Sequence, residues 1–191
     1  MSIQRAQQPK ASTGFTLIEL VIIIAIVSIL GVIALSRYAD LKQQAELSSA
    51  QYIASSLKTG VDTVKLVFRT AGHTTRVQNL AGYGDGTIDT NNIGYPIGTT
   101  KGNGNENIGV GNAGCVGVWE GVLDAPPSVA INNNSNADYR SYRHDGNKVC
   151  SYVYRAGGDT ANRNNAQLVI RYDSRDGSVE VCGRRSDIPN C

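Results

Sequence analysis

The chain has 191 residues, of which 41% are hydrophobic and only 18% are charged. Its 18 basic and 16 acidic side chains nearly balance, which gives no strong electrostatic case for binding to nucleic acid or to an anionic membrane surface. The length is sufficient for one domain with a substantial core.

The chain opens with a short polar segment, residues 1–14, that contains Arg5 and Lys10 and no acidic residue. The next 21 residues, Phe15 to Leu35, are apolar apart from small polar residues and one carboxylate, Glu19. About 20 apolar residues suffice for a helix to cross a bilayer, and basic residues before such a run stay on the cytoplasmic side. A lone acid inside such a segment is costly and therefore indicates a function.

Two ordinary explanations of this segment fit less well. A secretory signal peptide has an apolar region of about 7–15 residues followed by a cleavage site of small residues, and this run is longer with no clean site after it. A plain membrane anchor matches the length but gives no reason for Glu19. The carboxylate could also snorkel to the headgroups, which would make it incidental.

The sequence from Gly14 to Glu19, Gly-Phe-Thr-Leu-Ile-Glu, resembles the N-terminal signature of type IV pilins and the related pseudopilins. The resemblance implies that a prepilin peptidase cuts between Gly14 and Phe15 and that Phe15 becomes methylated. Loss of the leader would remove Arg5 and Lys10, leaving 16 basic and 16 acidic residues. In a filament, Glu19 is then expected to pair with the amine of Phe15 on a neighbouring subunit, since an unpaired buried charge is costly.

The apolar run is expected to continue as one helix over about residues 15–68, roughly 80 Å long at 1.5 Å per residue. Beyond Ser36 the pattern becomes amphipathic, with apolar residues at steps of three and four, which predicts packing on a domain. These residues are Leu41, Ala45, Ala50, Ile53, Ala54, Leu57, Val61, Val64 and Phe68.

Residues 69–114 are expected to form a connecting region that ends in a Gly/Asn-rich loop from Lys101 to Gly114. Its acidic and amide residues, Asp85, Asp89, Asn91 and Asn92, are interpreted as turn residues. Calcium is the alternative, although their spacing is not that of an EF-hand loop.

Residues 115–129 predict one or two helical turns ended by Pro126 and Pro127, with Trp119 as a core residue. Residues 148–155, 167–172 and 178–182 predict three strands. A fourth strand is expected from residues 139–143 or from the connecting region. The predicted fold is therefore α+β, a long N-terminal helix packed on an antiparallel sheet of about four strands.

All four cysteines lie beyond the apolar segment, and an even number outside the cytoplasm predicts two disulfides. Of the three pairings, we favour Cys115–Cys150 and Cys182–Cys191, because the latter closes a short C-terminal loop and the former would fix a loop to the sheet. A zinc site is disfavoured, since the sequence has no C-x-x-C and no paired histidines.

Several later segments resemble the mannose-sensitive haemagglutinin (MSHA) group of type IVa pilins: residues 93–98, the stretch from Cys115 to Pro126, and the runs around Cys150 and Tyr172. Cys182 and Cys191 look like additions to that pattern. The resemblance implies a filament subunit with three parts: a leader (1–14), an apolar half-helix (15–38) and a globular domain (39–191). The implied location is the inner membrane before assembly and an extracellular pilus afterwards.

The implied partners are further copies of this chain, prepilin peptidase, the inner-membrane assembly platform and other pilins. Attachment is the implied role, with motility as a further use, and no residue assigns the surface or host receptor.

No catalytic motif surrounds His73 or His144, so we expect no enzyme, no cofactor and no metal. The stretch 139–144 interleaves aromatic and basic residues, but an exposed strand explains it as well as nucleic-acid binding does. A pseudopilin, a minor adhesin or a DNA-uptake pilin are the alternative functions.

Overall fold

The structure, a computed structural model, describes residues 14–101, 104–133 and 136–191. The expected leader lies outside the described residues except for Gly14, as do small parts of the two Asn-rich loops. The chain divides into two compact units, residues 1–44 and 45–191. A single helix, α1 (Leu17–Thr70, 54 residues), contributes to both, and its bounds lie within two residues of the predicted ones.

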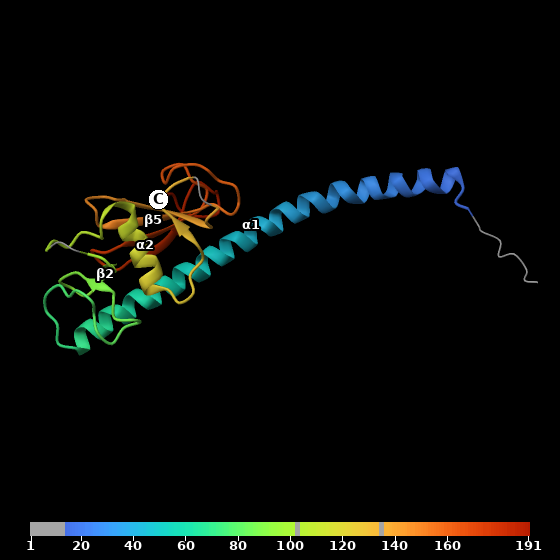
Figure 1. The fold of residues 1–191 in the computed structure, drawn as a ribbon. Coiled ribbons are helices and arrows are strands. Elements are labelled where there is room, and N and C mark those ends of the chain that lie inside the picture. The colour runs from blue at the N-terminus through green and yellow to red at the C-terminus, as the bar shows by residue number, and fades with distance from the viewer. Residues whose placement is uncertain (1–13, 102–103, 134–135) are drawn as a thin grey trace, which may run out of the picture. The chain divides into compact units, whose positions relative to one another are not determined.

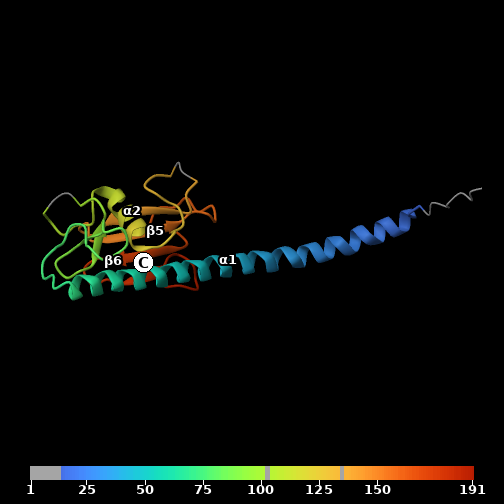
Figure 2. The ribbon, with the colours of Figure 1, turned by 60° about the horizontal axis from the view of Figure 1, so that its bottom comes forward.

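The second part of α1 forms one wall of the core of residues 45–191 (Figure 2). Its buried residues recur at helical spacing along one stripe, as predicted. They are Ala50, Ile53, Ala54, Leu57, Val61, Val64 and Phe68. The prediction was wrong for Leu41 and Ala45, which are exposed, because the buried stripe begins only around Leu47 and Ala50.

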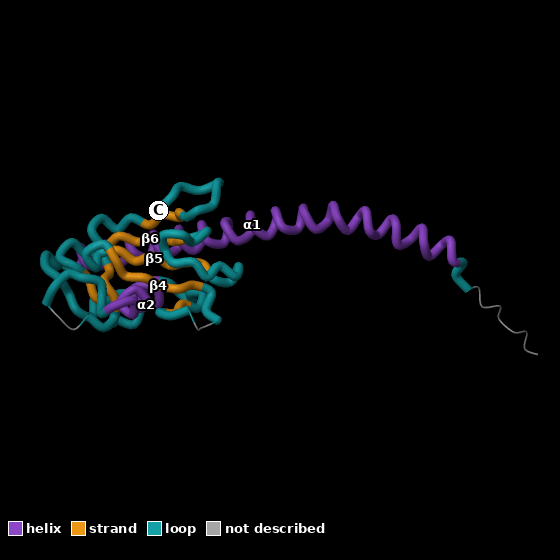
Figure 3. Tube along the Cα trace, turned by 90° about the horizontal axis from the view of Figure 1, so that it is seen from above, coloured by secondary structure: helices purple, strands orange, loops and turns teal. Residues whose placement is uncertain are grey.

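A five-stranded sheet in the order β3-β4-β5-β6-β7 packs against this helix. The strands are β3 (Val129–Ala130), β4 (Tyr139–His144), β5 (Val149–Tyr154), β6 (Val169–Asp173) and β7 (Val179–Cys182). Figure 3 shows β4, β5 and β6 side by side, with α2 next to β4. The α+β class is confirmed, and the fourth strand does come from the 139–144 stretch. The sheet also gains the short β3, which pairs with β4 in parallel.

A second helix, α2 (Gly111–Val122), is longer and starts earlier than the predicted one or two turns. Glycines are poor helix formers, so this Gly-rich segment gives a weak helical signal. Their lack of side chains instead allows close approach: a Cβ on Gly114 would lie 2.6 Å from the Gly109 Cα, and one on Gly117 would lie 3.0 Å from the Thr99 hydroxyl. Tertiary packing therefore overrides intrinsic propensity here. The helix ends at Val122, before the prolines.

The connecting region holds a small antiparallel pair, β1 (Asp89–Thr90) and β2 (Pro96–Gly98), with α2 packed on β2 (Figure 1). Trp119 is the core residue expected: its ring centroid lies 4.4 Å from that of Tyr152, and its indole N–H donates to the Pro127 carbonyl at 2.9 Å. The buried indole is thus both packed and hydrogen-bonded.

Candidate functional site

The start of α1 is organised by a reciprocal pair of hydrogen bonds between Thr16 and Glu19. The Glu19 Oε2 accepts from the Thr16 amide at 2.9 Å and from the Thr16 hydroxyl at 2.8 Å, while the Glu19 amide donates to the Thr16 Oγ1 at 3.3 Å. The first turn of a helix has amide groups with no partner inside the helix, and this arrangement, a capping box, satisfies two of them. Glu19 therefore fixes where the helix begins.

This arrangement leaves part of the Glu19 carboxylate free. Both Thr16 bonds use Oε2, and no described residue bonds to Oε1 or pairs with Glu19 as a cation. A carboxylate near a helix N-terminus is also favoured by the helix dipole. The acid is thus positioned locally while retaining an acceptor for a group from elsewhere.

The first turns of α1 carry an apolar surface with no cover in the structure. Every large hydrophobic side chain between Phe15 and Leu35 is exposed. These are Phe15, Leu17, Ile18, Leu20, Val21, Ile22, Ile23, Ile24, Ile26, Val27, Ile29, Leu30, Val32, Ile33 and Leu35. Among the described residues, α1 is the one helix long and apolar enough to cross a membrane. A patch of this kind is typical of a surface that lipid or other subunits cover.

The remaining polar groups in this segment are satisfied or accessible. The Ser28 hydroxyl donates to the Ile24 carbonyl at 2.6 Å, which removes the cost of a bare hydroxyl among apolar residues. Gly14 and Phe15 precede the helix and are exposed, so the bond between them is accessible. The structure therefore brings Gly14, Phe15 and Glu19 together at one helix end.

The sequence reasoning missed Thr16. Its signal was present, because Thr-x-x-Glu at the start of an apolar helical run is the signature of a capping box. Thr16 is the residue that orients the Glu19 carboxylate, so it belongs to the same candidate site.

Both disulfides have the predicted pairing. Cys115–Cys150 joins α2 to β5, and both residues are fully buried. Cys182–Cys191 ties the C-terminal segment to β7, with Cys182 buried and Cys191 exposed. The first lies inside the core, and the second closes the loop at its edge.

The acidic and amide residues of the 85–92 segment are engaged by nearby backbone donors. The Asp89 carboxylate accepts from the amides of Asn79 and Lys101, and the Asn91 Oδ1 accepts from the amides of Ile93 and Tyr95. This is the behaviour expected of turn residues. In the part of the chain that the structure describes, no group of three or more His, Cys, Asp or Glu is placed to hold a metal ion.

Strand alternation divides the aromatic and basic stretch 139–144 between two faces of the sheet. Tyr139 and Ser141 are buried toward the core, with the Ser141 hydroxyl donating to the Asn112 carbonyl of α2. Arg140 instead stacks on Tyr142 at 4.5 Å, on the opposite face. Only part of the stretch therefore shares one face, since Tyr139 points into the core and the Arg143 guanidinium donates to the carbonyls of Ile108 and Gly109.

Comparisons with known proteins agree with the N-terminal geometry. Residues 9–35 match the family described as the prokaryotic N-terminal methylation motif. A fimbrial protein from Moraxella nonliquefaciens is 51% identical over 53 residues, covering 28% of this chain and 34% of that protein. A fimbrial protein from Pseudomonas aeruginosa is 42% identical over 57 residues, covering 30% and 37%.

A type IV major pilin, PilE1, from Neisseria gonorrhoeae is 50% identical over 48 residues, covering 25% of this chain and 29% of the relative. The matches thus span about a third of the length of these relatives. No solved structure is significantly similar.

Proposed function

We propose that this chain, a type IV pilin by its N-terminal segment, is a structural subunit that polymerises into an extracellular pilus. The precursor is anchored in the inner membrane by the first part of α1, and the globular domain is displayed outside. The shared motif and the fimbrial relatives support this assignment. Because the matches cover a minority of each relative, the filament and its partners are inferences for this chain.

One observation carries the proposal: residues 15–35 form an exposed apolar segment whose only acid, Glu19, is held in place at the start of the helix. Lipid can cover the apolar side chains of a single subunit, but the hydrocarbon core offers Glu19 no partner. A bundle of such helices can cover the same side chains and supply a cation as well. The combination favours a helix that leaves the bilayer to pack with copies of itself.

The proposed partner of Glu19 is the amine that cleavage creates. Cutting between Gly14 and Phe15 gives Phe15 a positively charged N-terminus, which methylation preserves as a cation. The Glu19 Oε1, free in the described chain, accepts the amine of the neighbouring subunit's N-terminus, while Oε2 keeps its bonds to Thr16. An unpaired charge in the packed apolar bundle would cost about 3–5 kcal/mol, so this pairing selects one axial register.

The decisive experiment is an intact mass and N-terminal sequence of the protein from filaments sheared off the cell surface. We expect a dominant species that starts at methylated Phe15 and gains four hydrogens on reduction of its two disulfides. A chain that retains Met1, or starts beyond Leu35, would refute the assignment.

The same measurement separates this role from its alternatives. A chain that starts at Phe15 but stays in membranes, absent from sheared material, would point to a pseudopilin or a minor pilin. The similarity to MSHA pilins, and with it attachment or motility, remains a prediction that binding of purified filaments to surfaces would test.

A further inference from the structure

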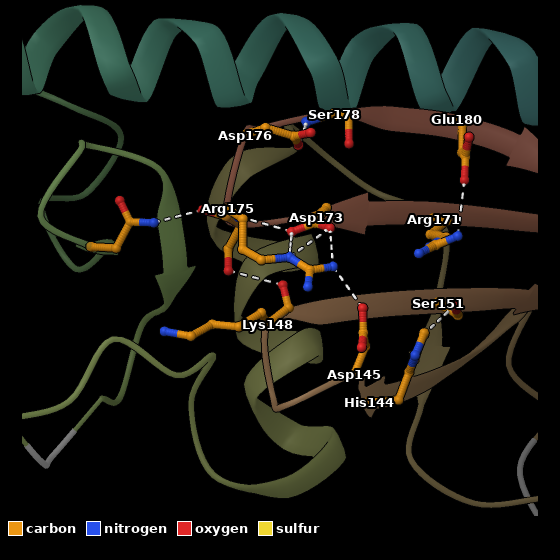
Figure 4. A network of polar contacts seen from close by, with 12 residues as sticks. His144, Asp145, Lys148, Ser151, Arg171, Asp173, Arg175, Asp176, Ser178 and Glu180 are labelled. Carbon is orange, nitrogen blue, oxygen red and sulfur yellow. Dashed lines mark hydrogen bonds and ion pairs between the residues drawn. The ribbon is translucent and has the colours of Figure 1, made fainter.

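The face of the sheet that points away from α1 carries a row of polar residues. Strand register places Ser151 of β5 opposite Arg171 of β6, and Arg171 opposite Glu180 of β7. His144 of β4 lies beside this row, with its Nε2 2.8 Å from the Ser151 Oγ (Figure 4). The neighbouring Val153, Val169 and Cys182 on this face are buried in a small second core. The polar row therefore lies directly beside a small buried apolar cluster.

A pocket of about 300 Å³ opens over this row. Three kinds of segment line the pocket: the sheet with its β4–β5 turn, the loop between β5 and β6, and the C-terminal residue. The lining residues are His144, Asp145, Ser151, Arg171, Arg163, Asn164 and Cys191. This volume lies at the small end of ligand pockets and is suited to one sugar-sized molecule. The imidazole of His144 is the one aromatic ring among these wall residues, and no Phe, Tyr or Trp is among them.

Two arginine side chains in the pocket wall, Arg163 and Arg171, have guanidinium donors with no partner among the described residues. Among the described residues, the Arg163 side chain makes no hydrogen bond or ion pair. Arg171 has one contact, from Nη1 to the Glu180 Oε1 at 3.3 Å, which leaves its other donors open. The one side-chain carboxylate in the wall, Asp145, is already paired with Arg175 at 2.6 Å (Figure 4).

We propose that this pocket binds a small oxyanion, a carboxylate or sulfate group, between Arg163 and Arg171. A guanidinium group presents two parallel N–H donors that match such a group, and these charge-assisted bonds are among the strongest available. Ser151 and Asn164 supply neutral polar groups for the remainder of the ligand. The oxyanion can be a free ion or part of an acidic sugar, and the site is separate from the assembly role of α1.

The pKa of His144 can be used to detect binding of an anion in this pocket. Burial, and then the charges of Arg163 and Arg171, lower the pKa of His144 to about 4, against the smaller opposing effects of Asp145 and Asp173. The imidazole is therefore neutral at pH 7. A bound oxyanion would offset the two arginines and favour the imidazolium form, so binding raises the pKa of His144 and strengthens as pH falls toward it.

The test uses the full chain in detergent, with the ring-proton NMR signals of His144 followed across pH and ligand concentration. Sodium glucuronate and sodium sulfate are compared with neutral glucose at constant ionic strength. We expect both anions to shift the His144 pKa upward and glucose to leave it unchanged. Equal affinity for the two anions indicates a simple oxyanion site, whereas at least tenfold tighter binding of glucuronate indicates an acidic sugar.

The variants are Arg163→Gln and Arg171→Gln, with Arg69→Gln as the matched control. Arg69 lies in the exposed last turn of α1 and loses the same charge without touching the pocket. We expect each pocket variant to weaken anion binding at least tenfold and the control to leave it unchanged. If Arg171→Gln unfolds, Arg163→Gln alone tests the anion site, because the Arg163 side chain makes no hydrogen bond or ion pair with a described residue that the substitution would remove. Binding that survives Arg163→Gln, or equal binding of glucose and glucuronate, would overturn the proposal.

Discussion

The two parts of α1 use apolar residues in opposite ways. In residues 17–35 every large hydrophobic side chain is exposed, around the whole helix. In residues 50–68 the buried residues follow one stripe, and polar residues such as Lys58 and Asp62 pair with each other on the exposed side. A helix that is apolar on all sides must be surrounded by lipid or by other helices, whereas an amphipathic helix needs to bury only one face.

The comparison teaches that folding and assembly depend on separate stretches of the chain. The domain of residues 45–191 encloses its own core, with two disulfides and an aromatic cluster around Trp119. Residues 14–35 have no such core among the described residues, and they keep one acid with a free oxygen. Substitutions in residues 14–35 should therefore change assembly, and substitutions in residues 45–191 should change stability.

The largest expected effect is that of Glu19→Ala on filament yield. Loss of the proposed pair costs about 3–5 kcal/mol per subunit, or at least about 100-fold in assembly. The unfolding temperature of the domain should not change, because Glu19 has no contact in it. Sheared filament protein is compared with membrane-bound protein, with Glu120→Ala, an exposed acid of α2, as control. Normal filament yield from Glu19→Ala would contradict the pairing.

The next effect separates the two disulfides. The chain-entropy relation predicts that loss of Cys115–Cys150, with a sequence separation of 35, costs about 4 kcal/mol. Loss of Cys182–Cys191, with a separation of 9, costs about 2.5 kcal/mol. Denaturant unfolding of the two double Cys→Ala variants, monitored by Trp119, measures this difference. A larger loss from the second pair would show that loop closure is not the dominant contribution.

Leu57→Ala and Leu41→Ala compare the two stretches of α1 directly. Leu57 is 0% exposed and its truncation leaves a cavity, so we expect the free energy of unfolding to fall by about 2–5 kcal/mol. Leu41 is 64% exposed, and the same truncation should change stability by less than about 0.5 kcal/mol. Thermal unfolding of the full chain in detergent provides both values. Similar losses at the two positions would mean that the buried stripe extends further than the structure indicates.

The smallest effect concerns the close packing of α2. Gly114→Ala would place a Cβ 2.6 Å from the Gly109 Cα, and backbone cannot yield as a flexible side chain can. We expect a loss of about 1–3 kcal/mol from this overpacking, despite the better helix propensity of alanine. Gly104→Ala is the control, because no atom lies within 4 Å of its added Cβ. A stabilised Gly114→Ala variant would show that propensity outweighs packing here.

Much of this fold could be predicted from local patterns. The apolar run, the amphipathic stripe and the alternating strands are periodic signals that report directly on helix and strand. The Thr16–Glu19 capping box was equally readable, although it was overlooked, because its partners lie three residues apart.

Other features depend on residues far apart in the sequence. In helix α2, Gly114 and Gly117 lie close to Gly109 and Thr99, and helix propensity scales do not include such contacts. The pocket of Arg163, Arg171 and His144 exists because strand register and a loop bring three separate segments together. Leu41 is exposed for a similar reason: where a helix meets its core depends on the core, not on the helix.

By itself, then, the sequence determined the long helix, the one acid of its apolar part and three of the strands, and it favoured the cysteine pairing that the structure shows. The tertiary structure alone decided the extent of α2, the parallel edge strand β3, the start of the buried stripe and the cationic pocket. The physical reason is the distance along the sequence over which each interaction acts. Hydrogen bonds within a helix and side-chain alternation along a strand involve residues close in sequence. Packing and charge clusters involve segments that come into contact only in the folded chain.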